Sequence, residues 1–232
     1  YYREALEKRR RVLGEEHPDT LTSISNMGFL LEAQGKLAEA EPYSREALEK
    51  RRRVLGEEHP DTLTSISNMG LLLQSQGKLD QAEPYFREAL EKRRRVLGEE
   101  HPDTLVSINN LGALLRAQGR IAEAEPLISE ALEKHRGVLG EDHPGTLHCI
   151  NTMGLLLEGQ GKFDQAEAYY REALEKRRRV LGEEHPDTLG VTGDLGRVLQ
   201  QQGKHQEALD LLAPIEPAAR KAFTGGNARR LA

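Results

Sequence analysis

Cysteine, aromatic residues and long apolar segments are scarce in this sequence. Cys149 is the only cysteine among 232 residues, so an intrachain disulfide bond is excluded. A single cysteine suits a reducing compartment, and we expect a cytoplasmic protein. Aromatic residues make up 4% of the chain, and tryptophan is absent. Neither a run of 18 apolar residues nor a signal peptide is visible, so the sequence predicts no association with a membrane.

The charge balance narrows the classes of partner. Charged residues make up 31% of the chain and the net charge is −5. A mild acidic excess argues against a nucleic-acid partner, which would favour a basic surface. A chain rich in Glu, Lys, Arg, Ala and Leu is typical of helical proteins with solvated faces.

The most informative feature is an internal repeat. The segment Leu-Gly-Glu-Glu-His-Pro-Asp-Thr recurs every 42 residues, beginning at Leu13, Leu55, Leu97, Leu139 and Leu181, and only the copy at Leu139 is altered. A fixed period of this length indicates a stacked array of supersecondary units. The near-identity of the copies is typical of recent duplication or consensus design. The sequence begins at Tyr1, inside a repeat and without Met, so we expect a fragment.

Each repeat has the pattern of two helices. His17-Pro18-Asp19 opens the first helix, since Pro suits its first position and Asp suits the positive end of the helix dipole. Ile24, Met27, Gly28 and Leu31 fall on one face of this helix. Gly35 ends the first helix. The second helix is predicted from about residue 36 to 54, with Leu37, Ala40, Ala47 and Leu48 buried, and Gly56 ends it.

The period divides the chain into an array and a terminal segment. We predict one solenoid over residues 1–213, with a capping segment and tail over 214–232. The array consists of a half repeat (1–14), four repeats (about 18–56, 60–98, 102–140 and 144–182) and a degenerate repeat (186–213). In the degenerate repeat, Gly190 and Gly193 weaken the first helix, and Pro214 interrupts the second.

The repeat resembles the tetratricopeptide repeat (TPR). The residues that carry this resemblance are Met27-Gly28, Leu31, Gly35, Leu37, Ala40 and Ala47-Leu48. The 42-residue period and Leu-Gly-Glu-Glu-His-Pro-Asp are similar to the longer repeat of kinesin light chain and related bacterial TPR proteins. The resemblance implies an all-α solenoid of antiparallel helix pairs, wound as a right-handed superhelix. It also implies that the first helices line a concave groove.

A helical wheel places a second stripe on each first helix, opposite the buried stripe. We call it the groove stripe. Its members are Thr22, Ser25, Asn26, Phe29, Thr64, Ser67, Asn68, Leu71, Val106, Asn109, Asn110, Ala113, His148, Asn151, Thr152 and Leu155. The fifth copy has Gly190, Gly193, Asp194, Arg197 and Gln201 at these places. The copies diverge here, while their second helices stay almost unchanged.

The chemistry of the groove stripe favours a protein or peptide partner. Its asparagines can donate and accept hydrogen bonds along an extended backbone, and residues such as Phe29 and Leu71 can contact apolar side chains. The leading hypothesis is a non-catalytic interaction scaffold without cofactors. The alternatives are that these asparagines only bond neighbouring helices, or that the chain is a structural array, natural or engineered. Such an array would self-associate end to end through the N-terminal half repeat.

Other signals favour structural roles. The Glu-Glu-His triplets occur once per repeat and cannot converge on one metal ion. His-Pro-Asp also occurs in J-domain co-chaperones, but here it recurs at every helix start, which capping explains. The arginine triplets, such as 51–53, are interpreted as a solvated outer face, and Cys149 beside His148 as a packed thiol. The sequence has neither a phosphate-binding glycine loop nor a His-Glu-x-x-His motif, so we predict no enzyme.

Overall fold

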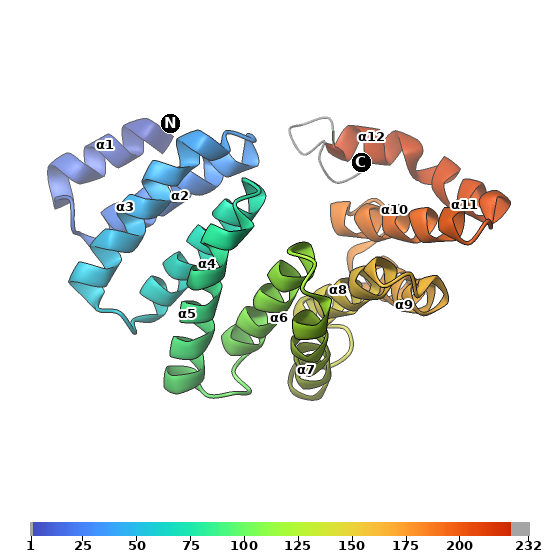
Figure 1. Cartoon of the computed structure of the whole chain (residues 1–232). Helices are drawn as coiled ribbons and strands as arrows, with labels where there is room; N and C mark the ends of the chain where they lie inside the picture. The colour runs from blue at the N-terminus through green and yellow to red at the C-terminus, as the bar shows by residue number, and fades with distance from the viewer. Residues whose placement is uncertain (1, 224–232) are drawn as a thin grey trace. The chain divides into compact units, whose positions relative to one another are not determined.

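The computed structural model describes residues 2–223, which form helices and turns without any strand. The first helices of the repeats are α2 (Pro18–Ala33), α4 (Pro60–Ser75), α6 (Pro102–Ala117), α8 (Pro144–Gly159) and α10 (Pro186–Gln201). The second helices are α1 (Tyr2–Leu13), α3 (Leu37–Leu55), α5 (Leu79–Leu97), α7 (Ile121–Leu139), α9 (Phe163–Leu181) and α11 (His205–Leu212). A 3₁₀ turn (Ala213–Ile215) and α12 (Glu216–Phe223) follow. The predicted all-α architecture of helix pairs is confirmed (Figure 1).

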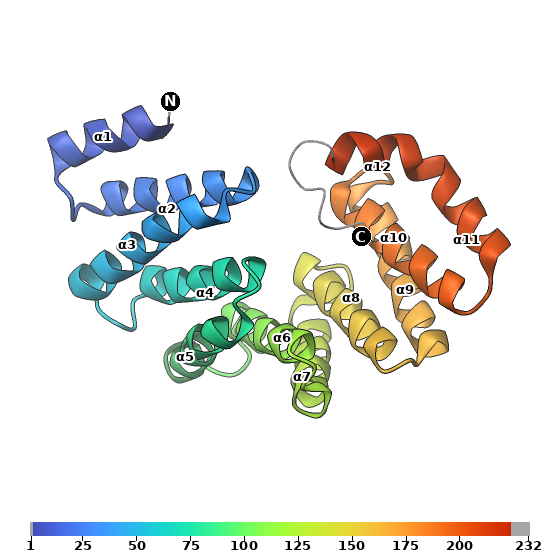
Figure 2. The same ribbon diagram turned by 45° about the horizontal axis from the view of Figure 1, so that its top comes forward.

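The chain forms two compact units, which divide inside α6 between Ser107 and Ile108. In the first unit, α2 packs against α1 and α3, and α4 packs against α3 and α5 (Figure 2). In the second unit, α8 packs against α7 and α9, and α10 packs against α9, α11 and α12. These four first helices therefore each lie between two second helices. The predicted tail beyond Phe223 lies outside the described residues, and the predicted single solenoid over 1–213 stays a prediction.

Histidine caps explain why His-Pro recurs at the helix starts. His17, His59, His143 and His185 are the N-cap residues of α2, α4, α8 and α10, with Pro at the following position. The Nδ1 atom of each histidine accepts a hydrogen bond from the backbone N–H two residues later, at 3.1–3.2 Å. This bond satisfies one of the free donors at the start of the helix. The predicted helix starts are confirmed.

A glycine in the left-handed region ends each first helix. Gly35 has a φ of +73°, and the backbone N–H of Lys36 turns back to the carbonyl of Leu31 at 2.8 Å. A residue with a Cβ would be strained at this φ. The next helix begins at Leu37, so the two helices of a pair are joined by a very short turn.

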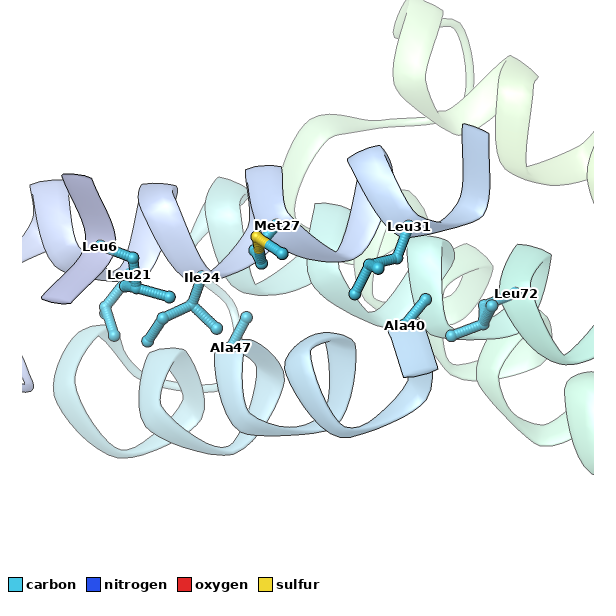
Figure 3. Packing of buried hydrophobic residues seen from close by; sticks show 8 residues of the cluster. All are labelled: Leu6, Leu21, Ile24, Met27, Leu31, Ala40, Ala47 and Leu72. Carbon is cyan, nitrogen blue, oxygen red and sulfur yellow. The ribbon is translucent and has the colours of Figure 1, made fainter. Parts of the chain in front are cut away.

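The core of the first unit is built from the predicted stripes. Leu21, Ile24, Met27 and Leu31 of α2 are buried together with residues of α1, α3 and α4 (Figure 3). The other members shown there are Leu6, Ala40, Ala47 and Leu72. Leu37, which was predicted to be buried, is only partly buried because it lies in the first turn of α3 at the edge of the cluster. In the described residues, no helix is long and apolar enough to cross a membrane.

The first arginine of three triplets is buried, which corrects the prediction of a solvated face at that position, whereas the third arginine is exposed as predicted. Arg51 is only 8% exposed and donates to Ser65 Oγ at 2.6 Å. Arg52 donates to both carboxylate oxygens of Glu88 in the next repeat, each at 2.7 Å. Arg53 donates to Glu16 of the preceding loop at 2.5 Å.

Ion pairs of this kind recur along the second helices. Arg10–Glu46 and Arg136–Glu172 repeat the 36-residue spacing of Arg52–Glu88. Such pairs, half-exposed and shared between neighbouring helices, fix the register of one repeat on the next more than they add stability. The near-constancy of the second helices follows from these contacts.

A glycine lies on each first helix where it crosses the second helix of its pair, and the residue that it faces on the second helix decides whether a larger side chain would fit. A Cβ on Gly154 would lie 2.6 Å from Cε1 of Tyr170, and Tyr170 is fully buried. A Cβ on Gly28 would lie 3.0 Å from Oγ of Ser44, which is a short side chain that can rotate. The same position in the repeat therefore tolerates a methyl group in one copy and not in another.

We expect Gly154→Ala to lower the free energy of unfolding by about 1–3 kcal/mol, because the buried Tyr170 ring cannot move away. Gly28→Ala is the matched control, and it should leave stability unchanged or raise it by up to about 1 kcal/mol through helix propensity. Thermal and urea unfolding followed by circular dichroism measures both. Equal effects of the two substitutions would contradict this account of the crossing.

Candidate functional site

Most of the groove stripe of the first unit faces solvent. On α2, Thr22, Asn26 and Phe29 are exposed, with Phe29 at 47%, and Ser25 is half-buried. On α4 the corresponding residues differ more in depth. Thr64 and Leu71 are exposed, Asn68 is half-buried, and Ser67 is buried at 6% exposure. Ser67 therefore contributes little surface for a partner.

A small hollow of about 10 Å³ lies between three helices of the first unit. Its lining contains Ser25, Phe29 and Glu32 of α2, Ser44 and Ala47 of α3, and Ser65 and Asn68 of α4. Three residues of the groove stripe, Ser25, Phe29 and Asn68, are thus brought together. Glu32 was not predicted, although it lies seven residues after Ser25 and three after Phe29, a spacing that places it on the same helical face.

Glu32 is the unusual group in this hollow. Its side chain is half-buried, and no hydrogen bond or ion pair engages its carboxylate within residues 2–223. Burial raises the pKa of Glu32 above its ordinary value. The acidic residues of the second helices are in a different state, since Glu46 and Glu88 each bind an arginine and a lysine.

The groove stripe of α6 has a mixed character. Val106 is 42% exposed, and Asn110 and Ala113 are half-buried. Asn109 is 1% exposed, and both polar atoms of its side chain lack a hydrogen-bond partner. Asn109 is therefore a core residue in this structure.

The second unit contains a larger hollow of about 350 Å³ between α8, α9 and α10. It is lined by Pro144, His148, Asn151 and Leu155 of α8, Arg177 of α9, and Asp187, Gly190, Val191 and Asp194 of α10. His148, Asn151 and Leu155 belong to the groove stripe. Thr152 does not reach the hollow, because it is 3% exposed and its Oγ1 donates to the carbonyl of His148 at 3.0 Å.

The glycine at position 190 opens this hollow. Thr22, Thr64, Val106 and His148 stand at the same place in the earlier repeats. A Cβ built on Gly190 meets no atom within 4 Å, so neighbouring helices do not require a glycine there. Glycine inside a helix costs about 1 kcal/mol relative to alanine. Gly190 therefore makes the α10 helix less stable than another residue would, although no packing contact requires a glycine at this position.

Asp194 supplies a carboxylate to the hollow. Arg197 Nη2 donates to Asp194 Oδ1 at 2.6 Å, while Asn151 Nδ2 reaches Asp194 Oδ2 only at 3.5 Å. Arg197 also binds Glu158, so two carboxylates share this arginine. Burial is the largest influence on Asp194, and it raises the pKa of this carboxyl above its ordinary value.

The floor of this hollow is altered in a second way. Arg9, Arg51 and Arg93 donate to Ser23, Ser65 and Ser107, at 2.5–2.7 Å. Val191 stands at the serine position in the last repeat, and Arg177 donates to the backbone carbonyl of Asp187 at 2.9 Å, as Arg9 and Arg93 do to the carbonyls of Asp19 and Asp103 at 3.3 Å. The loss of the serine leaves an apolar side chain at the base of the hollow.

Cys149 has a partner that the sequence analysis missed. His135 Nδ1 lies 3.4 Å from Cys149 Sγ and 2.7 Å from the carbonyl of Ala131. His135 and Cys149 stand at the positions that Arg51 and Ser65 occupy in an earlier repeat. Both pairs are 14 residues apart, and this spacing could have indicated the contact from the sequence. Burial raises the pKa of the Cys149 thiol to about 12, so the thiol is inert. The predicted packed thiol is confirmed by its exposure of 1%.

Gly145 is a third residue, after His135 and Cys149, at which this repeat differs from the others around the arginine–serine position. A Cβ there would lie 2.9 Å from Cδ2 of His135, so the imidazole needs the glycine that replaces the aspartate of the other repeats. Burial lowers the pKa of His135, and its Nε2 has no hydrogen-bond partner. In the described residues, no group of three or more His, Cys, Asp or Glu side chains could hold a metal ion.

We expect the triple variant H135R/G145D/C149S, which restores the arginine–serine pair, to remove one source of acid sensitivity. The folded state favours neutral His135, so its contribution is fully present above pH 6.5, the ordinary pKa of histidine, and is lost as pH falls toward the lowered pKa. The stability gap between variant and parent should widen between pH 7.5 and 5, by at most about 1.4 kcal/mol per pH unit. Urea unfolding at several pH values measures the gap, and parallel curves would contradict the assignment.

Comparison with known proteins gives consistent results for the fold. A family model described as tetratricopeptide repeat matches residues 1–49, 20–95, 61–133, 106–178 and 150–213. The comparison with curated proteins found no match.

Several solved structures are similar over most of the chain. A kinesin light chain-like protein of nearly identical TPR-like repeats from Podosopora anserina is 23% identical, with a TM-score of 0.69 over 90% of this chain and 98% of that one. BtubC (BKLC) from P. vanneervenii is 24% identical, with a TM-score of 0.74 over 97% and 90%. NprR in complex with its cognate peptide NprX is 18% identical, with a TM-score of 0.76 over 99% of this chain and 65% of that one.

Proposed function

Because this chain belongs to the tetratricopeptide-repeat family, we propose that it is a non-catalytic scaffold that binds a peptide or partner segment on its first helices. The observation that carries the proposal is the convergence of groove-stripe residues on hollows. Ser25, Phe29 and Asn68 line one in the first unit, and His148, Asn151 and Leu155 line one in the second. We also propose that the first helices line a continuous concave groove, as the family resemblance implies, and that the protein is cytoplasmic.

The physical argument rests on which side of a first helix is free. The neighbouring second helices cover the stripe that contains Ile24 and Met27, so a ligand can reach only the remaining face. That face combines exposed apolar groups such as Phe29 and Leu71 with amides that can bond a backbone. NprR, a structure of similar fold, holds its cognate peptide NprX, which supports a peptide as the class of ligand.

The test is a selection of random dodecapeptides on the immobilised chain, followed by dissociation constants of the selected peptides from fluorescence anisotropy. Micromolar affinity, about −8 kcal/mol, is typical of single peptide contacts. Phe29→Ala and Leu155→Ala should each weaken binding about tenfold, because they remove apolar contact area. Asn68→Ala and Asn151→Ala should weaken it less.

Val54→Ala and Val138→Ala serve as controls for this selection. These valines are 40% and 44% exposed on the second helices, comparable with Leu71 and Phe29. They should leave affinity unchanged. Failure to select any peptide, or equal losses in control and groove variants, would refute a binding surface on the first helices.

A structural array that self-associates is a second candidate function. It is favoured by α1, where Tyr2 and Val12 are 52% and 66% exposed. Under this alternative, light scattering across a concentration series should give a mass that rises with concentration, and Val12→Glu should suppress the rise. A constant monomer mass up to about 100 µM would exclude association at an affinity relevant to weak interfaces.

A further inference from the structure

The two hollows share a chemical feature that the proposed function does not specify. Each contains a half-buried carboxylate whose hydrogen-bonding capacity is incompletely used, Glu32 in the first unit and Asp194 in the second. We infer that a segment bound at either hollow carries basic side chains, and that a lysine or arginine is received by Glu32 in the first unit and by Asp194 in the second. This inference rests on the proposed function and names the class of its ligand.

The contrast with other acidic residues supports the assignment at Glu32. On the second helices, Glu41, Glu46 and Glu88 are bound by cations of the same chain. Glu32 shares its hollow with serine, asparagine, alanine and phenylalanine, and none of these can neutralise it. A carboxylate that loses hydration without gaining a partner destabilises the free protein, and an incoming cation would reverse that cost.

Asp194 has one carboxylate oxygen that is only weakly bonded. Oδ1 is occupied by Arg197 at 2.6 Å, but Oδ2 has only the long contact of 3.5 Å to Asn151. Arg197 is shared between Asp194 and Glu158, and Arg177 lines the same hollow, so this carboxylate is already partly neutralised. The gain from a basic ligand is therefore mainly a charge-assisted hydrogen bond to Oδ2, and it should be smaller than the gain at Glu32.

The shape of the second hollow also fits a long side chain. Gly190 leaves open the space that a threonine, valine or histidine fills in the earlier repeats. Leu155 and Val191 provide apolar walls, against which the methylene groups of lysine or arginine can pack. Asp194 lies one helical turn after Gly190, so the carboxylate and the space adjoin on one face of α10.

The experiment uses the same dodecapeptide selection on the full chain, with sequencing of the selected pool. Lysine and arginine should be enriched at least about twofold over the input, and affinity should fall as salt rises because the contacts are partly exposed. Selection on the double variant E32Q/D194N should lose this enrichment. Binders without basic enrichment would overturn the inference while leaving the proposed function intact, whereas the absence of any binder would sink both.

Single variants separate the two carboxylates. For a selected basic peptide, Glu32→Gln should weaken binding about fivefold and Asp194→Asn about twofold to threefold, since neither change alters side-chain size. Glu91→Gln and Glu133→Gln remove the same charge from exposed positions of α5 and α7 and should have no effect. A variant that leaves the dissociation constant unchanged removes its carboxylate from the proposal.

A steric variant distinguishes ligand contact from loss of folding. Gly190→Thr restores the residue of the first two repeats and fills the open space. It should maintain or raise the melting temperature, because threonine is a better helix former than glycine, while weakening the basic peptide at least about fivefold. Unchanged affinity for Gly190→Thr would show that no ligand side chain enters this hollow.

Discussion

The burial of α2, α4, α8 and α10, each between two second helices, is the constraint on which the rest of the structure depends. In the first unit, α2 places Leu21, Ile24 and Met27 in one apolar cluster with residues of α1, α3 and α4. Two sides of the helix are thereby used, and only one stripe stays free for contact with another molecule. The surface proposed for binding is thus the part of the first helices that the second helices do not cover. Its position follows from how the helices pack within each repeat.

The polar contacts of the second helices complete this constraint. Arg51, Arg52 and Arg53 are consecutive, yet each reaches a different element: the next first helix, the next second helix and the preceding loop. A substitution at any of them would disturb a different interface between repeats. On the free face of the first helices one position carries Phe29, Leu71, Ala113 and Leu155 in successive copies, and the helices keep the same bounds within the repeat.

Helix bounds, caps and core stripes could be predicted from the sequence because they depend on contacts within about four residues and on a strict period. The burial of Arg51 could not, since it depends on Ser65 returning to the same helix after a loop. For the same reason Cys149 was compared with its neighbour His148, although its contact is His135. A helical wheel also gives direction but not depth, so Ser67, Asn109 and Thr152 were assigned to the groove stripe but are buried.

The last first helix shows how packing and binding can be separated within one element. Gly196 of α10 is required by its neighbours, because a Cβ would lie 2.7 Å from Cδ1 of Leu212. Gly190, two turns earlier, is required by none of them. Both glycines weaken the helix, but only Gly196 makes room for a neighbouring side chain of the same chain. When an element carries a cost that no internal contact offsets, the compensation is expected from outside the molecule. At Gly190 the open space lies beside the carboxylate of Asp194 and the apolar group of Leu155, and from this combination we infer a ligand side chain that is long and positively charged at its end.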